Sequence, residues 1–117
     1  MAEKIEYKLK HIGINCADAK EAYDLNATLC KTFNLTPGAD RATNIFAGTI
    51  FEVMKNTKRG KCGHIALQVK DVEAAMKDLA AKGYSFQEDS ILRDEQGKIR
   101  FVYLQQQLGG FAIHLTI

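Results

Sequence analysis

The chain has 117 residues, of which 46% are apolar, enough to bury one core in a single compact domain or in two small halves that share it. Its net charge of +2 is too small for a typical nucleic-acid-binding domain. The charged segment Met1–Glu6 lacks the apolar core of a signal peptide, and no run approaches the ~18 apolar residues of a membrane span. The three cysteines have no C-x-x-C spacing, which favours free thiols. We therefore expect a cytoplasmic protein that binds neither nucleic acid nor membranes.

The first predicted strand covers residues 7–16. Its alternation places Ile12, Ile14 and Cys16 on an apolar face, and His11, Gly13 and Asn15 on the other face. A helix is predicted from 18 to 33, because Asp18 and Glu21 have the D-x-x-E spacing of a capping box. The apolar stripe expected on this helix contains Ala19, Ala22, Tyr23, Leu29, Cys30 and Phe33, with Asn26 as a polar member.

Residues 35–40, which include the only proline, are predicted to be a turn-rich break. Two short strands at about 42–46 and 49–55 follow, joined as a hairpin near Ala47–Gly48. The polar, glycine-bearing stretch 56–63 is interpreted as the connection between two halves of the chain. The first half is therefore predicted to hold a strand, a helix and a small antiparallel set.

The second half is predicted to follow the same plan. A strand over 64–70 has Ile65, Leu67 and Val69 on its apolar face, and His64, Ala66 and Gln68 on the other. A helix begins at Asp71, with Val72, Ala75, Met76 and Leu79 on its buried stripe, and it ends at Lys82–Gly83. Further strands are expected at about 84–92, 98–105 and 110–117.

The two halves share sequence features as well as a plan. Segments 10–18 and 63–71 each contain a histidine that opens a strand and an aspartate that leads into an alanine-rich helix. The closing segments 48–52 and 110–114 each place a glycine four residues before a polar residue. We interpret the chain as a duplicated unit, with a first module at 1–57 and a second at 58–117 that share a cleft.

Four polar side chains occupy matched positions in the two copies: His11, Glu52, His64 and His114. Taken alone, a histidine at the start of a strand is more often a surface or hydrogen-bonded residue than a ligand. The recurrence at matched positions favours a joint site, provided that the two halves curve around a common cleft. Imidazoles with a carboxylate suit zinc, nickel, cobalt, manganese or iron(II), whereas calcium and magnesium prefer oxygen ligands. The pattern therefore predicts a divalent transition metal held by these four residues.

These motifs resemble the vicinal oxygen chelate superfamily, which includes glyoxalase, bleomycin-resistance proteins, methylmalonyl-CoA epimerase, fosfomycin-resistance enzymes and extradiol dioxygenases. The resemblance extends over nearly the whole chain, from H-I-G-I-N-C-A-D through G-H-I-A-L-Q-V-K-D to G-G-F-A-I-H-L. It implies an α+β fold in which two tandem βαβββ modules form a curved mixed sheet, the cup of the glyoxalase-like fold. It also implies a homodimer, with the cleft inside one chain or between two.

The resemblance further implies roles for the four residues. His11 and His64 match metal ligands on the first strand of each module, and Glu52 matches the ligand on the last strand of the first module. His114 stands where the superfamily usually has glutamate, which is a departure. The implied activity is that of a lactoylglutathione lyase-type enzyme, in which a metal stabilises an enediolate and a base moves a proton. Glu52 and His114 are the catalytic candidates, although a metal-bound imidazole cannot act as a base.

Three alternatives stay open at this point. An extradiol-type dioxygenase could use two histidines and Glu52 around iron, but the chain is short for that branch. A non-catalytic cup that sequesters an aromatic or cationic small molecule, as bleomycin-resistance proteins do, is disfavoured by the histidines. A purely structural module would require the matched residues to be coincidental.

Other polar residues have simpler interpretations. The basic residues Lys55, Lys58, Arg59 and Lys61 are expected to be a solvated linker rather than a clamp for an anionic substrate tail. Arg100 and Tyr103 lie on opposite faces of one predicted strand, so at most one can face the cleft. Asn15 and Gln68 share the histidine face and are candidates for contacts with ligands or substrate.

Overall fold

A computed structural model describes residues 4–117, and it contains two successive βαβββ units. The first unit consists of β1 (Lys8–Asn15), α1 (Ala19–Phe33), β2 (Pro37–Asp40), β3 (Asn44–Ala47) and β4 (Phe51–Met54). The second consists of β5 (Gly63–Gln68), α2 (Val72–Ala81), β6 (Phe86–Arg93), β7 (Ile99–Leu108) and β8 (Phe111–Thr116). The predicted α+β class and the paired βαβββ plan are confirmed.

The eight strands form one mixed sheet in the order β2-β3-β4-β1-β5-β8-β7-β6. Strand β1 pairs in parallel with β4, and β5 pairs in parallel with β8. The two units meet through the antiparallel pair β1 and β5. The first and last strands of both units therefore lie side by side in the middle of the sheet, and these four strands carry the predicted ligands.

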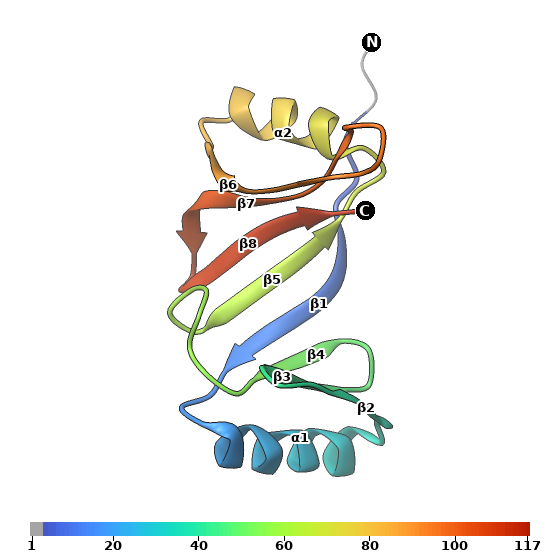
Figure 1. Cartoon of the computed structure of the whole chain (residues 1–117), viewed down its shortest axis with the longest axis vertical. Coiled ribbons are helices and arrows are strands. Elements are labelled where there is room, and N and C mark those ends of the chain that lie inside the picture. The colour runs from blue at the N-terminus through green and yellow to red at the C-terminus, as the bar shows by residue number, and fades with distance from the viewer. Residues whose placement is uncertain (1–3) are drawn as a thin grey trace.

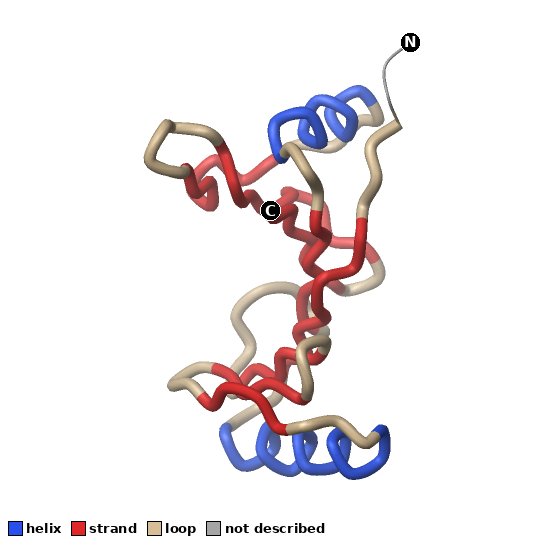
Figure 2. Tube along the Cα trace, turned by 90° about the vertical axis from the view of Figure 1, so that its right-hand side faces the viewer, coloured by secondary structure: helices blue, strands red, loops and turns tan. Residues whose placement is uncertain are grey.

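The sheet is strongly curved. In Figure 2 both ends of the sheet turn toward the same side, and the two helices lie outside the bend. Figure 1 shows α1 and α2 at opposite ends of the long axis, each beside the outer strands of its own unit. The middle strands β1 and β5 thus have no helix over their concave face, which leaves that face open for functional side chains.

Each helix covers its own small core. The larger core lies under α2 and contains Val69, Val72, Ala75, Ile99, Val102, Leu104, Ile113 and Leu115. The smaller core lies against α1 and contains Cys16, Ala22, Ile45 and Val53. The predicted buried stripe of α2 is confirmed, since Val72 and Ala75 are buried and Met76 and Leu79 pack against the same core.

Helix α1 begins where the sequence predicts, but part of its predicted apolar stripe is wrong. The Asp18 side chain accepts a hydrogen bond from the Glu21 amide at 2.9 Å, as expected for an N-cap. Tyr23 is 42% exposed, and Phe33, the last residue of the helix, is 61% exposed. The buried residues are Ala22 and Asn26, and Leu25 and Leu29 pack against the core. Tyr23 lies outside the buried face and takes part in a polar cluster.

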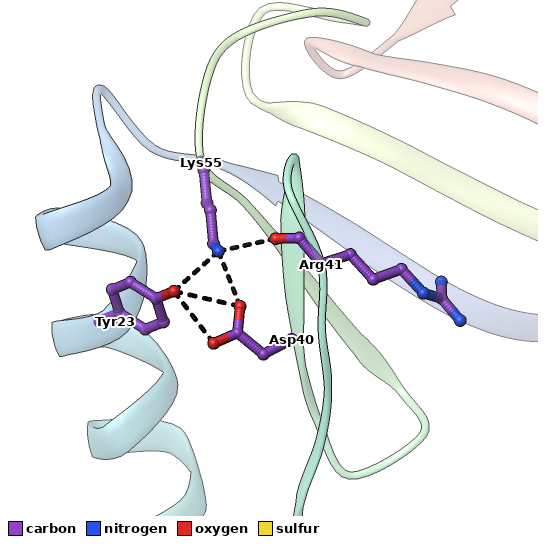
Figure 3. Close-up of polar contacts among 4 residues, drawn as sticks. All are labelled: Tyr23, Asp40, Arg41 and Lys55. Atoms are coloured by element: carbon purple, nitrogen blue, oxygen red, sulfur yellow. Dashed lines mark hydrogen bonds and ion pairs between the residues drawn. The ribbon is translucent and has the colours of Figure 1, made fainter.

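That cluster joins Tyr23, Asp40, Arg41 and Lys55 (Figure 3). The Lys55 ammonium donates to Asp40 Oδ1 at 2.7 Å, to the Tyr23 hydroxyl at 2.8 Å and to the Arg41 carbonyl at 2.7 Å. The Tyr23 hydroxyl donates to Asp40 in turn. The Lys55 side chain is only 11% exposed, so the expectation that it belongs to a solvated linker is wrong. Lys55, which follows β4, connects α1 to the end of β2 and to the β2–β3 connection through these hydrogen bonds.

The predicted break at residues 35–40 is also wrong in part, because 37–40 form the edge strand β2. Its sequence Pro-Gly-Ala-Asp has no apolar alternation, and all four residues are exposed. An edge strand tolerates proline, since one side of it needs no ladder hydrogen bonds. The hairpin predicted after it exists as β3 and β4. Strand β4 lies inside the expected range, whereas β3 begins two residues later and ends one residue later than expected.

Candidate metal centre

Four side chains from four adjacent strands meet on the concave face of the sheet. They are His11 on β1, Glu52 on β4, His64 on β5 and His114 on β8. Glu52 Oε1 lies 2.8 Å from His64 Nε2 and 3.4 Å from His11 Nε2, and the two Nε2 atoms lie 3.3 Å apart. Each of the three histidines offers a nitrogen within 4.8 Å of the others. The predicted residues are therefore together in space, and their role as ligands stays a prediction.

The register of the sheet explains this convergence. On β1, Gly13 is the cross-strand partner of both Glu52 and His64. On β5, Ala66 is the partner of both His11 and His114. In each central strand, a small residue thus lies between functional side chains of the two neighbouring strands. This small residue is two positions after the histidine of its own strand.

Gly13 is required to be small. A Cβ atom built at Gly13 would lie 2.1 Å from His64 Cε1, so the His64 imidazole occupies the space above the glycine. The strand alternation predicts that Gly13 lies on the histidine face but indicates no role for it. The signal that could have found it is the matched small residue Ala66 in the second copy.

Glu52 is held as a carboxylate. Burial alone would raise its pKa, but hydrogen bonds with His11 and His64 outweigh burial and lower the pKa to about 2. Its second oxygen, Oε2, accepts a hydrogen bond from Asn44 Nδ2 at 2.8 Å. Because Asn44 occupies Oε2, the other oxygen is the one that faces the histidines. The sequence patterns do not single out Asn44, which is buried in the structure; the available signal was an asparagine that opens a short apolar strand.

His114 is neutral and enclosed by aromatic rings. Burial, followed by the proximity of His64 and His11, lowers its pKa to about 3. The ring centroids of Phe101 and Tyr103 lie 4.4 and 5.0 Å from that of His114. Among residues 4–117, the buried Nδ1 of His114 has no hydrogen-bond partner. A neutral, buried imidazole is the protonation state that metal binding needs.

The donor set fits a divalent transition metal. Bonds of about 2.0–2.2 Å to nitrogen and oxygen place neighbouring ligand atoms about 3 Å apart. The three separations among His11, Glu52 and His64 lie between 2.8 and 3.4 Å. Imidazole nitrogens with one carboxylate oxygen are the ligands that zinc, nickel, cobalt and iron(II) accept. The arrangement is compatible with each of these ions and does not choose among them.

Comparisons with known proteins bear on the fold. No protein-family model and no curated protein sequence matches the chain. Among solved structures, methylmalonyl-CoA epimerase from Mycobacterium tuberculosis aligns with a TM-score of 0.66 at 16% identity, over 99% of this chain and 91% of that chain. The protein has the glyoxalase-like fold.

Two other solved structures agree with this fold. A hypothetical protein, BH1468 from Bacillus halodurans C-125, aligns with a TM-score of 0.62 at 19% identity, over 95% of this chain and 94% of that chain. A variant of Streptomyces coelicolor methylmalonyl-CoA epimerase, in complex with 2-nitronate-propionyl-CoA, aligns with a TM-score of 0.59 at 18% identity, over 94% of each chain. At these identities the likeness concerns the fold, so the chemistry must be derived from the residues of this chain.

In this fold the four residues line a cleft of about 400 Å³. Its remaining walls are formed by Lys10, Asn15, Thr43, Met54, Lys58, Arg59, Phe101, Tyr103 and Thr116. Tyr103 therefore lines the cleft whereas Arg100 does not, which agrees with the opposite-face expectation. Gln68 is outside the cleft, so it is not a contact residue there.

The two helices of this fold are short. Within residues 4–117, no helix combines the length and the apolar character needed to cross a membrane.

Proposed function

We propose that this protein is a metal-dependent enzyme that moves a proton on a small substrate with two adjacent oxygen atoms. The observation that carries the proposal is the meeting of His11, Glu52, His64 and His114 at one point of a cleft. The neutral His114 imidazole and the ionised Glu52 carboxylate can bind a cation without first losing protons to solvent. A divalent transition metal, when bound, would act as a Lewis acid toward the two substrate oxygens.

The ligand count leaves room for such a substrate. Because Asn44 holds Glu52 Oε2, Glu52 offers one oxygen, and each histidine offers one nitrogen. The three atoms from His11, Glu52 and His64, with or without His114 as a fourth ligand, leave positions for two substrate oxygens on an ion with a coordination number of about six. Phe101 and Tyr103 form the aromatic wall beside His114, which limits the access of water to that side of the cleft.

The proton acceptor is proposed to be His114 or Glu52, the two catalytic candidates. Glu52 is engaged by His11, His64 and Asn44, so it is the less free of the two to accept a proton. The Nδ1 of His114 has no hydrogen-bond partner among the described residues. We therefore assign His114 the proton transfer and the other three residues the holding of the metal, with His114 not a ligand during that step. The pKa of about 3 makes the metal-free His114 a weak base, so this assignment requires that the bound metal strongly acidify the substrate carbon–hydrogen bond.

Two reactions of this kind are candidates. The first is isomerisation of the thiohemiacetal of a 2-oxoaldehyde, the reaction of a lactoylglutathione lyase. The second is epimerisation beside the thioester of an acyl-CoA, which the methylmalonyl-CoA epimerases among the structural neighbours favour. Both remove a proton next to a carbonyl group, so the same residues could serve either. The homodimer, the cytoplasmic location and the module boundary at residues 57 and 58 stay predictions, the first of which light scattering would test.

The test is isotope exchange in deuterium oxide. Protein loaded with zinc, nickel, cobalt, manganese or, without oxygen, iron(II) is mixed with the methylglyoxal–glutathione adduct or with methylmalonyl-CoA, and deuterium at the carbon next to the carbonyl is measured by NMR. We expect metal-dependent exchange with one substrate, abolished in His64→Ala and retained in Gln68→Ala, whose side chain lies outside the cleft. His114→Gln should keep the metal and lose exchange. Exchange with neither substrate would argue for the non-catalytic cup, and oxygen consumption by the iron(II) protein with a catechol would favour the dioxygenase.

A further inference from the structure

The side chain of Arg59 is fixed in the wall of the cleft. Its guanidinium carbon lies 4.3 Å from the centroid of the Tyr103 ring, and its Nη1 donates to Gln87 Oε1 at 2.6 Å. Arg59 is half-buried and lines the cleft. The expectation that Arg59 belongs to a solvated linker is therefore wrong.

The backbone that carries Arg59 is fixed as well. Asn15 Nδ2 donates to the carbonyl oxygens of Arg59 at 3.2 Å and of Gly60 at 3.0 Å. Gly60 has φ +73°, and a Cβ there would lie 2.0 Å from the Gly63 carbonyl oxygen. Only glycine fits that position, so the connection between β4 and β5 is held close to the sheet. The guanidinium is thus positioned before any ligand arrives, at a low entropic cost of binding.

No carboxylate in the described part of the chain, residues 4–117, compensates this cation. Among residues 4–117, no aspartate or glutamate forms an ion pair with Arg59. Its two partners, the Tyr103 ring and the Gln87 amide, are uncharged. Glu52 is the one acidic residue among those that line the cleft, and it faces His11 and His64. A half-buried guanidinium without a counterion attracts an anion from solution.

The position of Arg59 relates it to the candidate metal centre. The Tyr103 ring that Arg59 covers also contacts the His114 ring, at 5.0 Å between centroids. The guanidinium therefore lies one aromatic ring away from the proposed ligands. With Nη1 engaged by Gln87, the Nε–Nη2 edge has no hydrogen-bond partner in the described part of the chain. That edge presents two parallel N–H donors, which match the two oxygens of a carboxylate.

We propose that Arg59 binds the carboxylate of a small organic anion, so that the substrate is a carboxylic acid whose adjacent oxygen pair lies beyond that carboxylate. The substrate class rests on the proposed function, whereas the carboxylate site does not. Arg59 is then a substrate-binding residue, and Tyr103, Gln87 and Asn15 position it. The cleft of about 400 Å³ suits a compact anion of this kind.

The first experiment uses metal-free protein. The Arg59 Nε–H resonance, assigned by its loss in Arg59→Gln, is followed by NMR during titration with propionate and, separately, with neutral propionamide. We expect a saturable shift with propionate alone. The matched control is Lys61→Gln, which removes one positive charge from the same connection outside the cleft and should keep the shift. Absence of the shift in the wild type, or an equal shift with propionamide, would overturn the carboxylate site.

The second experiment uses zinc-loaded protein and calorimetry. 2-Oxoglutarate and 2-oxopentanoate share the same oxygen pair and chain length, and only the former has a second carboxylate. We expect 2-oxoglutarate to bind about tenfold more tightly or better. Arg59→Gln should abolish this preference, and Arg59→Lys, which keeps the charge but not the planar fork, should lose most of it. Both variants should keep the wild-type zinc content, which shows that the candidate metal centre is intact.

The outcomes separate the two proposals. The substrate class would be overturned if the wild type bound 2-oxoglutarate no more tightly than 2-oxopentanoate, or if Arg59→Gln kept the preference for 2-oxoglutarate. Failure of zinc to bind would contradict the proposed function, and the propionate titration would still decide the Arg59 site.

Discussion

At the scale of single residues, the missing side chain at position 13 determines where the His64 imidazole can lie. The Gly13→Ala substitution would place a methyl group 2.1 Å from His64 Cε1, so the ring must leave its place beside Glu52. We predict that zinc affinity, measured by competition with a chromophoric chelator, falls at least about tenfold. Ala66→Gly is the matched control, because it empties the equivalent position, and it should keep affinity within a few-fold. A Gly13→Ala protein with wild-type affinity would show that His64 is not a ligand.

Asn44 acts on the site through Glu52. Asn44→Ala removes the donor on Oε2 and leaves the carboxylate free to rotate, so we predict a loss of about 10- to 100-fold in zinc affinity. Asn44→Asp should bind still more weakly if the new carboxylate repels Glu52. Gln105→Ala, an exposed amide substitution on β7, serves as the control for both in the same assay. Unchanged affinity in Asn44→Ala would mean that Glu52 needs no such support.

The buried His114 predicts how the stability of the metal-free protein depends on pH. Its folded-state pKa is lowered from 6.5 to about 3, so below pH 6.5 the unfolded chain binds a proton that the folded chain does not. The free energy of unfolding should therefore fall as the pH falls, by at most about 1.4 kcal/mol per pH unit from this group. Glu52, with its pKa lowered to about 2 from 4.5, adds the same trend only below pH 4.5.

Urea denaturation between about pH 7 and pH 5 isolates the histidine contribution. His114→Gln, which does not titrate, should flatten the dependence over this range. A slope in the variant equal to that of the wild type would contradict the account of His114.

At the scale of elements, α1 depends on one lysine for its attachment to the sheet edge. Lys55 joins Tyr23 of α1 to Asp40 at the end of β2 through hydrogen bonds of 2.7–2.8 Å (Figure 3). We predict that Lys55→Ala lowers the melting temperature and speeds hydrogen exchange in α1 and β2 more than in α2. Lys20→Ala, which removes an exposed ion pair with Asp24, should change neither. Uniform loss of protection across both modules would contradict this local role.

The elements also show what the sequence could and could not predict. The strands that contain His11 and His64 were predictable because apolar residues alternate there, and each helix because an aspartate caps it. Strand β2 was missed, since Pro-Gly-Ala-Asp pairs at an exposed edge without burying a side chain. The four candidate ligands were found through the repeat. Asn44, Gly13 and Arg59 were not, because their contacts depend on cross-strand register and on the path of a connection, which local patterns do not encode.

At the scale of the whole molecule, the β1–β5 pair makes one site out of two modules. Each module contributes its first and last strand to the site. Gly13 and Ala66 occupy equivalent places in the two modules, each paired across the sheet with two of the four site residues. A ligand bound by both modules stabilises the folded state as a whole, by about 2.7 kcal/mol at a free concentration of 100 times the dissociation constant. The two modules differ at one site position: His114 in the second module occupies the position that Glu52 has in the first. We propose that the proton transfer takes place at His114.

The most direct test of the account is the metal content of the purified protein. Wild type, His64→Ala and Gln68→Ala are produced without a histidine tag, kept away from chelators and analysed by mass spectrometry of the elements. The account predicts about one equivalent of a transition metal per chain in the wild type and in Gln68→Ala, and none in His64→Ala. A wild-type protein that holds no metal, and takes up none from zinc, nickel, cobalt, manganese or anaerobic iron(II), would contradict it.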